Sequence, residues 1–496
     1  MIPNFTATNY DFTEYTKARN LIGNEWRDSK SGIADLDVIN PRYGKAMSTV
    51  TMSDADDVAA AVAAAQAALP AWKALPIRER AQVMYRAKAI MERDLEELTW
   101  LTSHENGKIY SEAKAEVLKG IECVEYGCSL PNLAAGNQLE VSRGVRCEQV
   151  FAPLGVVAGV TPFNFPFMVP LWMMPQALTG GNAFILKPSE QVPLTTLRLA
   201  EIFKEAGLPE GIFQIVQGGR AAVEALCDNE DIKALAFVGS TRVAKLVYAR
   251  GSITGKKMLC LGGAKNHLIV VPDADLQLTA QNVMASFTGC AGQRCMAASV
   301  MVAVGDVQHI IDEVARQAGE MVTGTTMGPL TNSISIDRIT GYIDEAEKAG
   351  AKVLVDGRGD TADEGGYWIG PTLIDNVTRE MPAGREEIFG PVLSIIHVDT
   401  VDEAIALENS NPYGNASAVY TTSGDVARKV MNGVDAGMCG VNIGVPVPRE
   451  PFGFGGWNDS KFGNGNITGW DGFRFWTRPR KITSKWAIQK DANWMS

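Results

Sequence analysis

The 496-residue sequence contains only four histidines, and its eight cysteines include no Cys-x-x-Cys pair. A structural zinc site needs four Cys or His ligands at characteristic spacings, and a disulfide framework needs a regular set of paired cysteines. We therefore expect neither a metal site nor a disulfide framework. Each cysteine has to be considered singly, with burial in a core as the ordinary alternative to a chemical role.

Dense clusters of Lys and Arg are also missing, and the formal net charge of −11 opposes binding to a phosphate backbone. The most apolar segment, residues 156–186, is interrupted by four prolines and a Gly-Gly pair, which excludes a membrane-spanning helix. Residues 1–17 carry no basic region followed by an apolar stretch, so no secretory signal is expected. We expect neither nucleic acid nor membrane as a partner, and a location in the cytoplasm or an organelle matrix.

Length and hydrophobic patterning predict an α/β protein. A chain of 496 residues exceeds one hydrophobic core, and 46% apolar residues are enough to build two or more. Short apolar runs alternate with helix-length segments, which is typical of βαβ units around parallel sheets, and two such series meet near residue 260. The first comprises residues 154–160, 183–187, 212–216 and 234–239; the second comprises 267–271, 299–305, 352–357, 391–399, 417–421 and 440–444.

Three further segments have readable patterns. Residues 53–69 predict an amphipathic helix that begins with capping-box spacing at Ser53 and Asp56 and ends at Pro70. Residues 138–152 alternate like a hairpin, and residues 480–488 alternate again. Exposed strands of this kind invite pairing with another subunit.

A dinucleotide site would normally show a Gly-x-Gly-x-x-Gly turn after a strand, and none is present. The sequence FVGST (237–241) instead turns from a strand through Gly239 into a helix that starts near Ser240, where free N–H groups suit a pyrophosphate. Lys187 and Glu190 in LKPSE follow another strand end and could hold ribose hydroxyls. Taken singly, each motif is more often an ordinary turn than a ligand site.

Three other residues could take part in chemistry. Asn164, in TPFNFP, could donate its amide to an oxyanion, and Cys295, in GQRCMA, has small neighbours and an adjacent cation, Arg294, that could favour a thiolate. Glu387, in EEIFGP, could bind a ribose. The alternatives are a turn-forming Asn, a buried structural Cys and a solvated Glu.

These motifs, followed by NPYGNASAVYT (411–421), occur in one order over some 260 residues, and in that arrangement the chain resembles the aldehyde dehydrogenase superfamily along essentially its whole length. The resemblance implies two Rossmann-like α/β domains with a small β oligomerisation extension, NAD as cofactor, and assembly into a homodimer or homotetramer. It assigns residues 1–134 and 153–258 to the NAD-binding domain, 259–465 to the catalytic domain, and 135–152 and 466–496 to oligomerisation.

By the family pattern Cys295 is the nucleophile, and the Asn164 side chain stabilises the oxyanion together with the Cys295 backbone N–H. A negative charge at Glu190 should favour NAD over NADP, because it repels an added phosphate. The resemblance implies cofactor contacts from Thr161, Phe163, Lys187, Glu190, Gly239, Ser240, Glu387 and Phe389.

Hydrolytic members of the superfamily typically carry a Glu two residues before a Gly-Gly pair, and here Cys260 holds that place in MLCLGGAKNH. A thiol is a poor substitute for the carboxylate base, so a thioester on Cys295 should persist until a thiol such as coenzyme A attacks it. GQRCMA and GGAKNH together resemble the CoA-acylating branch that oxidises malonate or methylmalonate semialdehyde to acetyl-CoA or propanoyl-CoA plus CO2.

In that branch the substrate carboxylate would be held by Arg294 and, at the place usually taken by a second Arg, by Lys119, which lacks the bidentate fork. The loop PFGFGGWNDSKFG (451–463) is closer to that of hydrolytic members. Two alternatives stay open: a hydrolytic NAD-dependent aldehyde dehydrogenase that releases a free acid, and a catalytically inactive scaffold.

Overall fold

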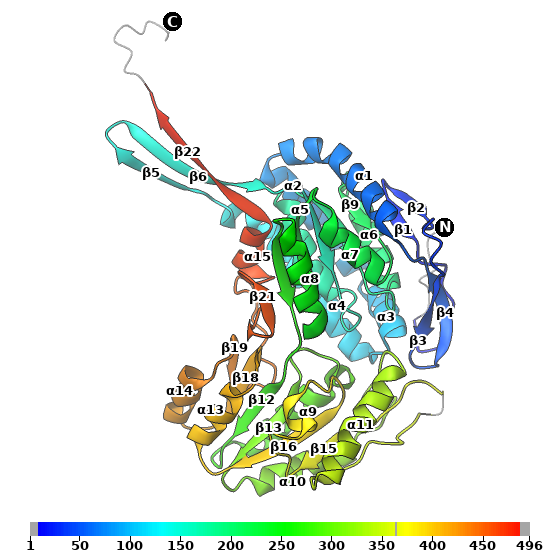
Figure 1. Ribbon diagram of the computed structural model, residues 1–496, viewed down its shortest axis with the longest axis vertical. Coiled ribbons are helices and arrows are strands. Elements are labelled where there is room, and N and C mark those ends of the chain that lie inside the picture. Colours follow the sequence, from blue (N-terminus) through cyan, green and yellow to red (C-terminus); the bar gives the residue numbers. More distant parts are fainter. Residues whose placement is uncertain (1–7, 363–364, 487–496) are drawn as a thin grey trace, which may run out of the picture.

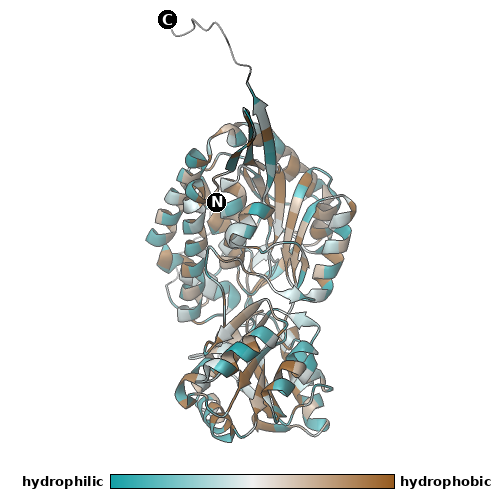
Figure 2. Cartoon of the chain, turned by 90° about the vertical axis from the view of Figure 1, so that its left-hand side faces the viewer, coloured by the Kyte–Doolittle hydropathy of each residue, from teal (hydrophilic) through white to brown (hydrophobic). Residues whose placement is uncertain are grey.

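The computed structural model describes residues 8–362 and 365–486. The chain forms two α/β bodies, each around its own sheet, and a three-stranded arm that projects from the first body (Figure 1). Figure 2 shows the bodies from the side, with hydrophobic residues gathered in the strands and polar residues on the outer helices. The expected α/β class is confirmed.

The first sheet has eight strands in the order β2-β1-β9-β8-β7-β10-β11-β21. Its middle five strands are parallel. Four of them, β7 to β10, are the first series of apolar runs, whereas β11 was not among the predicted runs. β7 and β8 are buried along their whole length, which is characteristic of parallel strands covered by helices. The strands are β1 (Asn20–Ile22), β2 (Glu25–Arg27), β7 (Val156–Val160), β8 (Ala183–Lys187), β9 (Phe213–Ile215), β10 (Ile232–Val238), β11 (Lys257–Leu261) and β21 (Lys461–Gly463).

Eight helices accompany this sheet within the described residues. The helix expected over 53–69 runs further, through Pro70 to Ala74, and Asp54 rather than Ser53 caps it. An internal proline costs roughly 3 kcal/mol; burial of Trp72, whose indole N–H donates to the Leu178 carbonyl at 3.0 Å, is worth about 4 kcal/mol by area and offsets that cost. The helices are α1 (Ala55–Ala74), α2 (Ile77–Arg93), α3 (Leu95–Asn106), α4 (Tyr110–Leu133), α5 (Met168–Thr179), α6 (Leu194–Glu205), α7 (Arg220–Asp228) and α8 (Thr241–Ile253).

The second sheet has seven strands in the order β14-β15-β16-β13-β12-β18-β19, all parallel except the edge strand β14. The second series of apolar runs therefore also forms one sheet. Its strands are β12 (Asn266–Val270), β13 (Ala298–Val304), β14 (Lys352–Val355), β15 (Thr372–Asp375), β16 (Val392–Val398), β18 (Ala416–Tyr420) and β19 (Met438–Val441). Its helices are α9 (Leu276–Thr288), α10 (Gln308–Gly319), α11 (Ile334–Lys348), α12 (Pro382–Arg385), α13 (Val401–Asn409) and α14 (Gly424–Gly433), with a 3-10 turn at Gly289–Gly292.

The arm contains the predicted hairpin, β5 (Asn137–Ser142) with β6 (Val145–Pro153), and β22 (Thr477–Lys485) pairs with β6. The buried Asn182 side chain joins both strands at the root of the arm. Its oxygen accepts from the N–H groups of Leu154 and Gly155, and its nitrogen donates to the Trp476 carbonyl at 2.8 Å. The smaller elements are β3 (Leu36–Asn40), β4 (Lys45–Val50), β17 (Tyr413–Gly414), β20 (Trp457–Asn458) and α15 (Gly469–Phe475).

The domain limits drawn from the sequence stay predictions. β21, which lies in the segment assigned to the catalytic domain, pairs with β11 of the first sheet. Residues 1–7 of the first segment and 487–496 of the last lie outside the described residues. No single helix in the described parts of the chain is long and apolar enough to cross a membrane, although α1 and α2, bent by 112°, pass that test as a pair.

Candidate active site

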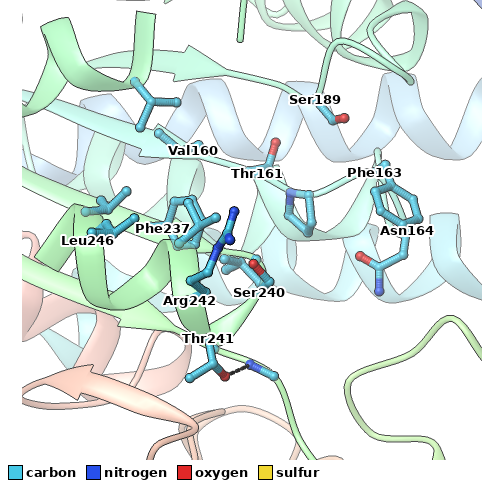
Figure 3. A pocket seen from close by; sticks show the side chains of 18 of the residues that line it. Val160, Thr161, Phe163, Asn164, Ser189, Phe237, Ser240, Thr241, Arg242 and Leu246 are labelled. Atoms are coloured by element: carbon cyan, nitrogen blue, oxygen red, sulfur yellow. Dashed lines mark hydrogen bonds between the residues drawn. The ribbon is translucent and has the colours of Figure 1, made fainter. Parts of the chain in front are cut away.

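A cavity of about 1450 Å3 opens at the carboxyl ends of β7, β8 and β10, the edge at which open α/β sheets bind ligands. Loops of the second body that carry Cys295 and Glu387 also line it. Figure 3 shows Thr161, Phe163 and Asn164 on the segment that follows β7, with Ser240 and Arg242 in the same pocket. Ten of the residues predicted from the sequence line this cavity: Thr161, Phe163, Asn164, Lys187, Glu190, Gly239, Ser240, Cys295, Glu387 and Phe389.

The half of the cavity next to the first sheet is formed by strand ends. Lys187 is the last residue of β8, and its Nζ lies 3.2 Å from a Glu190 carboxylate oxygen. Burial lowers the pKa of Lys187, while Glu190 acts in the opposite direction. The pair places one cation and one anion where hydroxyl groups of a ligand could bridge them.

The turn of FVGST has the geometry that its sequence suggests. β10 ends at Val238 and α8 begins at Thr241, so Ser240 is the N-cap, and its hydroxyl makes no capping bond in the described structure. A side chain at Gly239 would come within 2.6 Å of the Phe237 ring, so only glycine fits there. The first turn of α8 therefore presents free N–H groups to the cavity.

Asn164 and the Cys295 loop are in direct contact. The Asn164 side chain is buried, and its amide nitrogen donates to the Gln293 carbonyl at 2.9 Å, two residues before Cys295. The predicted oxyanion donor and the predicted nucleophile are thus brought together from segments 130 residues apart.

Cys295 itself is partly exposed to the cavity. Its backbone carbonyl accepts from two side-chain amides, Asn266 at 2.8 Å and Asn415 at 2.9 Å. Burial, with a contribution from the charge of Glu387, raises the pKa of the thiol to about 12, and the opposing effect of Arg294 is smaller. The expectation that Arg294 favours the thiolate is therefore outweighed by desolvation in this structure.

Glu387 and Phe389 approach from the second body. The Glu387 carboxylate accepts from the Ala264 N–H at 3.0 Å, and burial raises its pKa to about 7. The Phe389 ring meets the Phe163 ring edge-on, with 5.9 Å between centroids, and Phe389 has a φ of 55°. A bulky residue in that strained region indicates that the surroundings fix its position.

Two predicted residues are placed differently. Neither Arg294 nor Lys119 is among the described residues that line the cavity. Arg294 donates to the carbonyls of Ala285 and Ser286, and Lys119 is paired with Glu450 at 2.9 Å and Glu122 at 3.1 Å. Their predicted role in holding a substrate carboxylate is not supported by these contacts.

Cys260 lies inside β11, fully buried and hydrogen-bonded in the sheet between β10 and β21. Burial raises the pKa of its thiol far above the ordinary value. It is not among the described residues that line the cavity. A thiol so placed is unable to act as a general base. This agrees with the prediction from the sequence that Cys260 does not replace the hydrolytic Glu.

Asn266 and Asn415 were missed by sequence reasoning, although both lie inside motifs that it singled out, GGAKNH and NPYGNASAVYT. Two amide side chains that hold one carbonyl could not be recognised before the two motifs were known to meet. The same holds for two charged residues that contact the Asn164 loop, Glu116 on α4 and Lys108 between α3 and α4.

The whole-chain arrangement matches one known group of proteins. A model of the aldehyde dehydrogenase family matches residues 26–482. The chain belongs to the aldehyde dehydrogenase family. The two-body fold, the cavity at the strand ends and the partly exposed Cys295 beside Asn164 are therefore those of a family member.

Individual relatives are similar over nearly the full length. Malonate-semialdehyde dehydrogenase from Halalkalibacterium halodurans is 43% identical over 95% of this chain and 98% of its own. Malonate-semialdehyde dehydrogenase 1 from Geobacillus kaustophilus is 44% identical over 95% and 98%.

Solved structures agree with this. The crystal structure of methylmalonate-semialdehyde dehydrogenase from Oceanimonas doudoroffii superposes with a TM-score of 0.93, at 40% identity over 96% of this chain and 99% of that one. A Sinorhizobium meliloti protein in complex with NAD has a TM-score of 0.94, at 39% identity over 97% and 100%.

Proposed function

We propose that this aldehyde dehydrogenase uses NAD and coenzyme A to oxidise a carboxylated semialdehyde, malonate or methylmalonate semialdehyde, to acetyl-CoA or propanoyl-CoA plus CO2. The observation that carries the proposal is the single cavity in which Cys295 and Asn164 meet the Lys187, Glu190 and Ser240 set. The names of the relatives support the substrate class.

The cavity fits NAD. Lys187 and Glu190 would bind ribose hydroxyls, the N–H groups around Ser240 would bind the pyrophosphate, and Glu387 would bind the nicotinamide ribose beside Thr161, Phe163 and Phe389. Val243 and Leu246 of α8 are 36% and 64% exposed and line the same cavity, which suits a flat adenine ring. The chemistry that NAD supplies when bound is hydride acceptance, which turns the thiohemiacetal on Cys295 into an acyl-thioester.

The protein's own residues perform the remaining steps. The Cys295 thiol loses its proton to solvent in the open cavity, the sulfur bonds to the aldehyde carbon, and the new oxyanion is held by the Asn164 amide and the Cys295 N–H. Because Cys260 is buried in β11, no carboxylate stands at the usual place of the hydrolytic base. The acyl-thioester loses its carboxylate as CO2, and the carbon that carried it takes up a proton, which leaves an acetyl or propanoyl group on Cys295. The thiol of coenzyme A then attacks this thioester, takes the acyl group and passes its proton to the Cys295 sulfur.

Arg294 and Lys119 would bind the substrate carboxylate only after some rearrangement. Arg294 Nε is buried without a hydrogen-bond partner in the described part of the chain, so the guanidinium retains one unused donor. Lys119 would have to exchange Glu450 for the substrate. We therefore assign the larger share of carboxylate binding to Arg294.

The experiment that tests the proposal compares turnover of malonate semialdehyde and NAD with and without coenzyme A, following NADH and acetyl-CoA. We expect one burst of NADH per active site without coenzyme A and steady turnover with it. Steady formation of free acid without coenzyme A would contradict the proposal. Absence of any burst, in both wild type and Cys295→Ala, would indicate the inactive scaffold.

A second candidate is supported by Glu387. Its carboxylate lines the cavity and burial raises its pKa to about 7, a value suited to a general base at neutral pH. If Glu387 activated water, the enzyme would be hydrolytic, and Glu387→Gln would abolish acid release while the NADH burst remained.

We also propose that the chain forms a homodimer or homotetramer through the arm. β5 is an edge strand with all six residues exposed, and such an edge readily pairs with another chain. The arm would form the oligomerisation extension, with the NAD-binding and catalytic domains limited as the sequence predicts. Sedimentation of the intact protein and of a variant with Pro at Val141 tests this, because a proline removes one donor from the paired edge.

A further inference from the structure

Helix α4 carries two buried carboxylates one turn apart, and each holds the backbone of a different active-site loop. Glu112 accepts from the Cys290 N–H at 2.6 Å, five residues before Cys295. Glu116 accepts from the N–H groups of Phe167 at 2.9 Å and Met168 at 3.2 Å, just after Asn164. One helix face therefore contacts both the loop of the nucleophile and the loop of the oxyanion donor.

The Glu116 contact is part of a buried ion pair. Lys108 Nζ lies 2.6 Å from the second Glu116 oxygen, and the two side chains are 2% and 0% exposed. The same ammonium donates to the Asn164 backbone carbonyl and lies 3.9 Å from the centre of the Phe165 ring. Burying such a pair is costly unless its charges are well compensated, and here each finds a partner on the Asn164 loop.

Glu116 also supplies something that α5 lacks. α5 begins at Met168 with no acidic residue in its first turn and no capping side chain of its own in the described structure. Orphan N–H groups at a helix start need an acceptor, and a carboxylate there is favoured by the helix dipole. Glu116 provides that acceptor from another helix, which fixes the point where the Asn164 loop enters α5.

The Glu112 contact lies where the backbone is strained. Cys290 and Ala291 have φ values of 55° and 50°, a region that non-glycine residues seldom occupy, and they lead directly toward Cys295. Strain of this kind persists only where neighbouring groups hold it. The bond from the Cys290 N–H to Glu112 is such a restraint.

We propose that Glu116 and Lys108, with Glu112 one turn before Glu116, are positioning residues for the acylation step, because they set the Asn164 amide against Cys295. The inference rests on the proposed function, in which Cys295 and Asn164 act on the aldehyde. It predicts that loss of the Glu116 charge slows chemistry at saturating substrate, since a donor displaced from the oxyanion stabilises it less.

The test is a double-mutant cycle of Glu116→Gln and Asn164→Ala, read as single-turnover NADH formation at saturating aldehyde and NAD. We expect Asn164→Ala to slow it by about 10²–10³-fold and Glu116→Gln by about 10-fold or more. Because Glu116 acts through Asn164, the double variant should be no slower than Asn164→Ala alone.

Glu105 provides a matched control. It is fully buried and accepts from the N–H groups of Leu194 at 2.7 Å and Thr195 at 2.9 Å, so it caps α6 from another helix as Glu116 caps α5. α6 contributes no residue to the cavity among those described. Glu105→Gln should lower thermal stability to a similar extent and leave the single-turnover rate unchanged when NAD is saturating.

Full single-turnover rate in Glu116→Gln would overturn the inference, and so would multiplicative losses in the double variant. If Asn164→Ala were itself fully active, the proposed function would fail instead, so the two failures are distinguishable. Should Glu116→Gln not fold, Lys108→Gln enters the same cycle, because it removes the bond to the Asn164 carbonyl. The inference then requires that Lys108→Gln be slow alone and without effect beside Asn164→Ala.

Discussion

The two halves of the cavity are held in place by different means. On the cofactor side, Lys187 and Gly239 directly end or follow strands of the first sheet, so strand register places them. On the reacting side, Asn164, Cys295 and Glu387 lie on loops that are held by hydrogen bonds from distant segments. Local sequence thus specifies the first half, whereas the second depends on contacts that no local motif contains.

The largest expected effect lies in the reacting half. Cys295→Ala removes the nucleophile, and we expect NADH formation to fall by on the order of 10⁶-fold, to below detection. Cys439→Ala serves as the control, because Cys439 is exposed and lies on β19. Rapid-mixing absorbance at 340 nm measures NADH formation by both variants. A residual burst in Cys295→Ala would show that the reacting half of the cavity does not depend on Cys295.

The next effect concerns pH. Since burial raises the pKa of the Cys295 thiol to about 12, the reactive thiolate fraction should grow about tenfold for each pH unit without levelling off, hence roughly 100-fold from pH 7 to 9. A free thiol, with a pKa near 8.5, should approach a plateau over the same range. The measurement is the rate of iodoacetamide labelling of Cys295 in the cofactor-free enzyme, with Cys295→Ala to identify the peptide. A plateau below pH 8 would show that the pKa of the Cys295 thiol is already lowered in the cofactor-free enzyme.

A smaller effect is expected in the cofactor half. Glu190→Gln removes a negative charge from a side chain that is 31% exposed, and relief of repulsion should raise kcat/KM for NADP about tenfold, which corresponds to about 1.4 kcal/mol. The kcat/KM for NAD should change less, since an amide still bonds ribose hydroxyls. Unchanged discrimination would mean that the 2′ position of the ribose lies away from Glu190.

The smallest effect concerns Lys119. Glu450→Gln would free this lysine from its ion pair, and a pair of this exposure is worth up to about 1 kcal/mol. We therefore expect KM for malonate semialdehyde to fall by about two- to fivefold, with no change for an uncharged aldehyde of similar size. Glu122→Gln, at the more exposed partner of Lys119, is the matched variant and should act more weakly. An unchanged KM for malonate semialdehyde in Glu450→Gln, or an equal change for both aldehydes, would contradict a role for Lys119 in substrate binding.

The difference between the halves also explains what the sequence could predict. Apolar runs of five to nine residues identified β7 to β10 in the first sheet and every strand except β15 in the second, and the turn after β10 places Gly239 and Ser240 as FVGST suggests. The strands β1, β2 and β21, of three residues each, and β15, of four, were missed, because so few residues show no period. The five-residue strand β11 was missed as well. Pro70 misled the prediction of α1, since the packing of Trp72 overrides a local rule.

Site prediction divided in the same way. Ten predicted residues line the cavity: strand ends and the family pattern agree on those of the cofactor side, and the family pattern alone identified those on loops, such as Asn164, Cys295 and Glu387. Arg294 and Lys119 were placed by the resemblance to the CoA-acylating branch, and the sequence could not reveal that backbone carbonyls and Glu450 would occupy them. Glu116 could not be found either, because its partners Lys108 and Phe167 lie on other segments and a buried Glu resembles any helical Glu in sequence.

The root of the arm has a consequence for quaternary geometry. Asn182 holds the end of β6 and the residue before β22 with one side chain, and the next residue begins β8, which ends at Lys187. This buried amide therefore helps to fix the angle at which the arm leaves the first body, together with the packing of Phe151 of β6 against Trp470 and Phe473 of α15. In any assembly built through the arm, Asn182 would therefore link the relative orientation of neighbouring subunits to the position of β8, the strand that ends at Lys187.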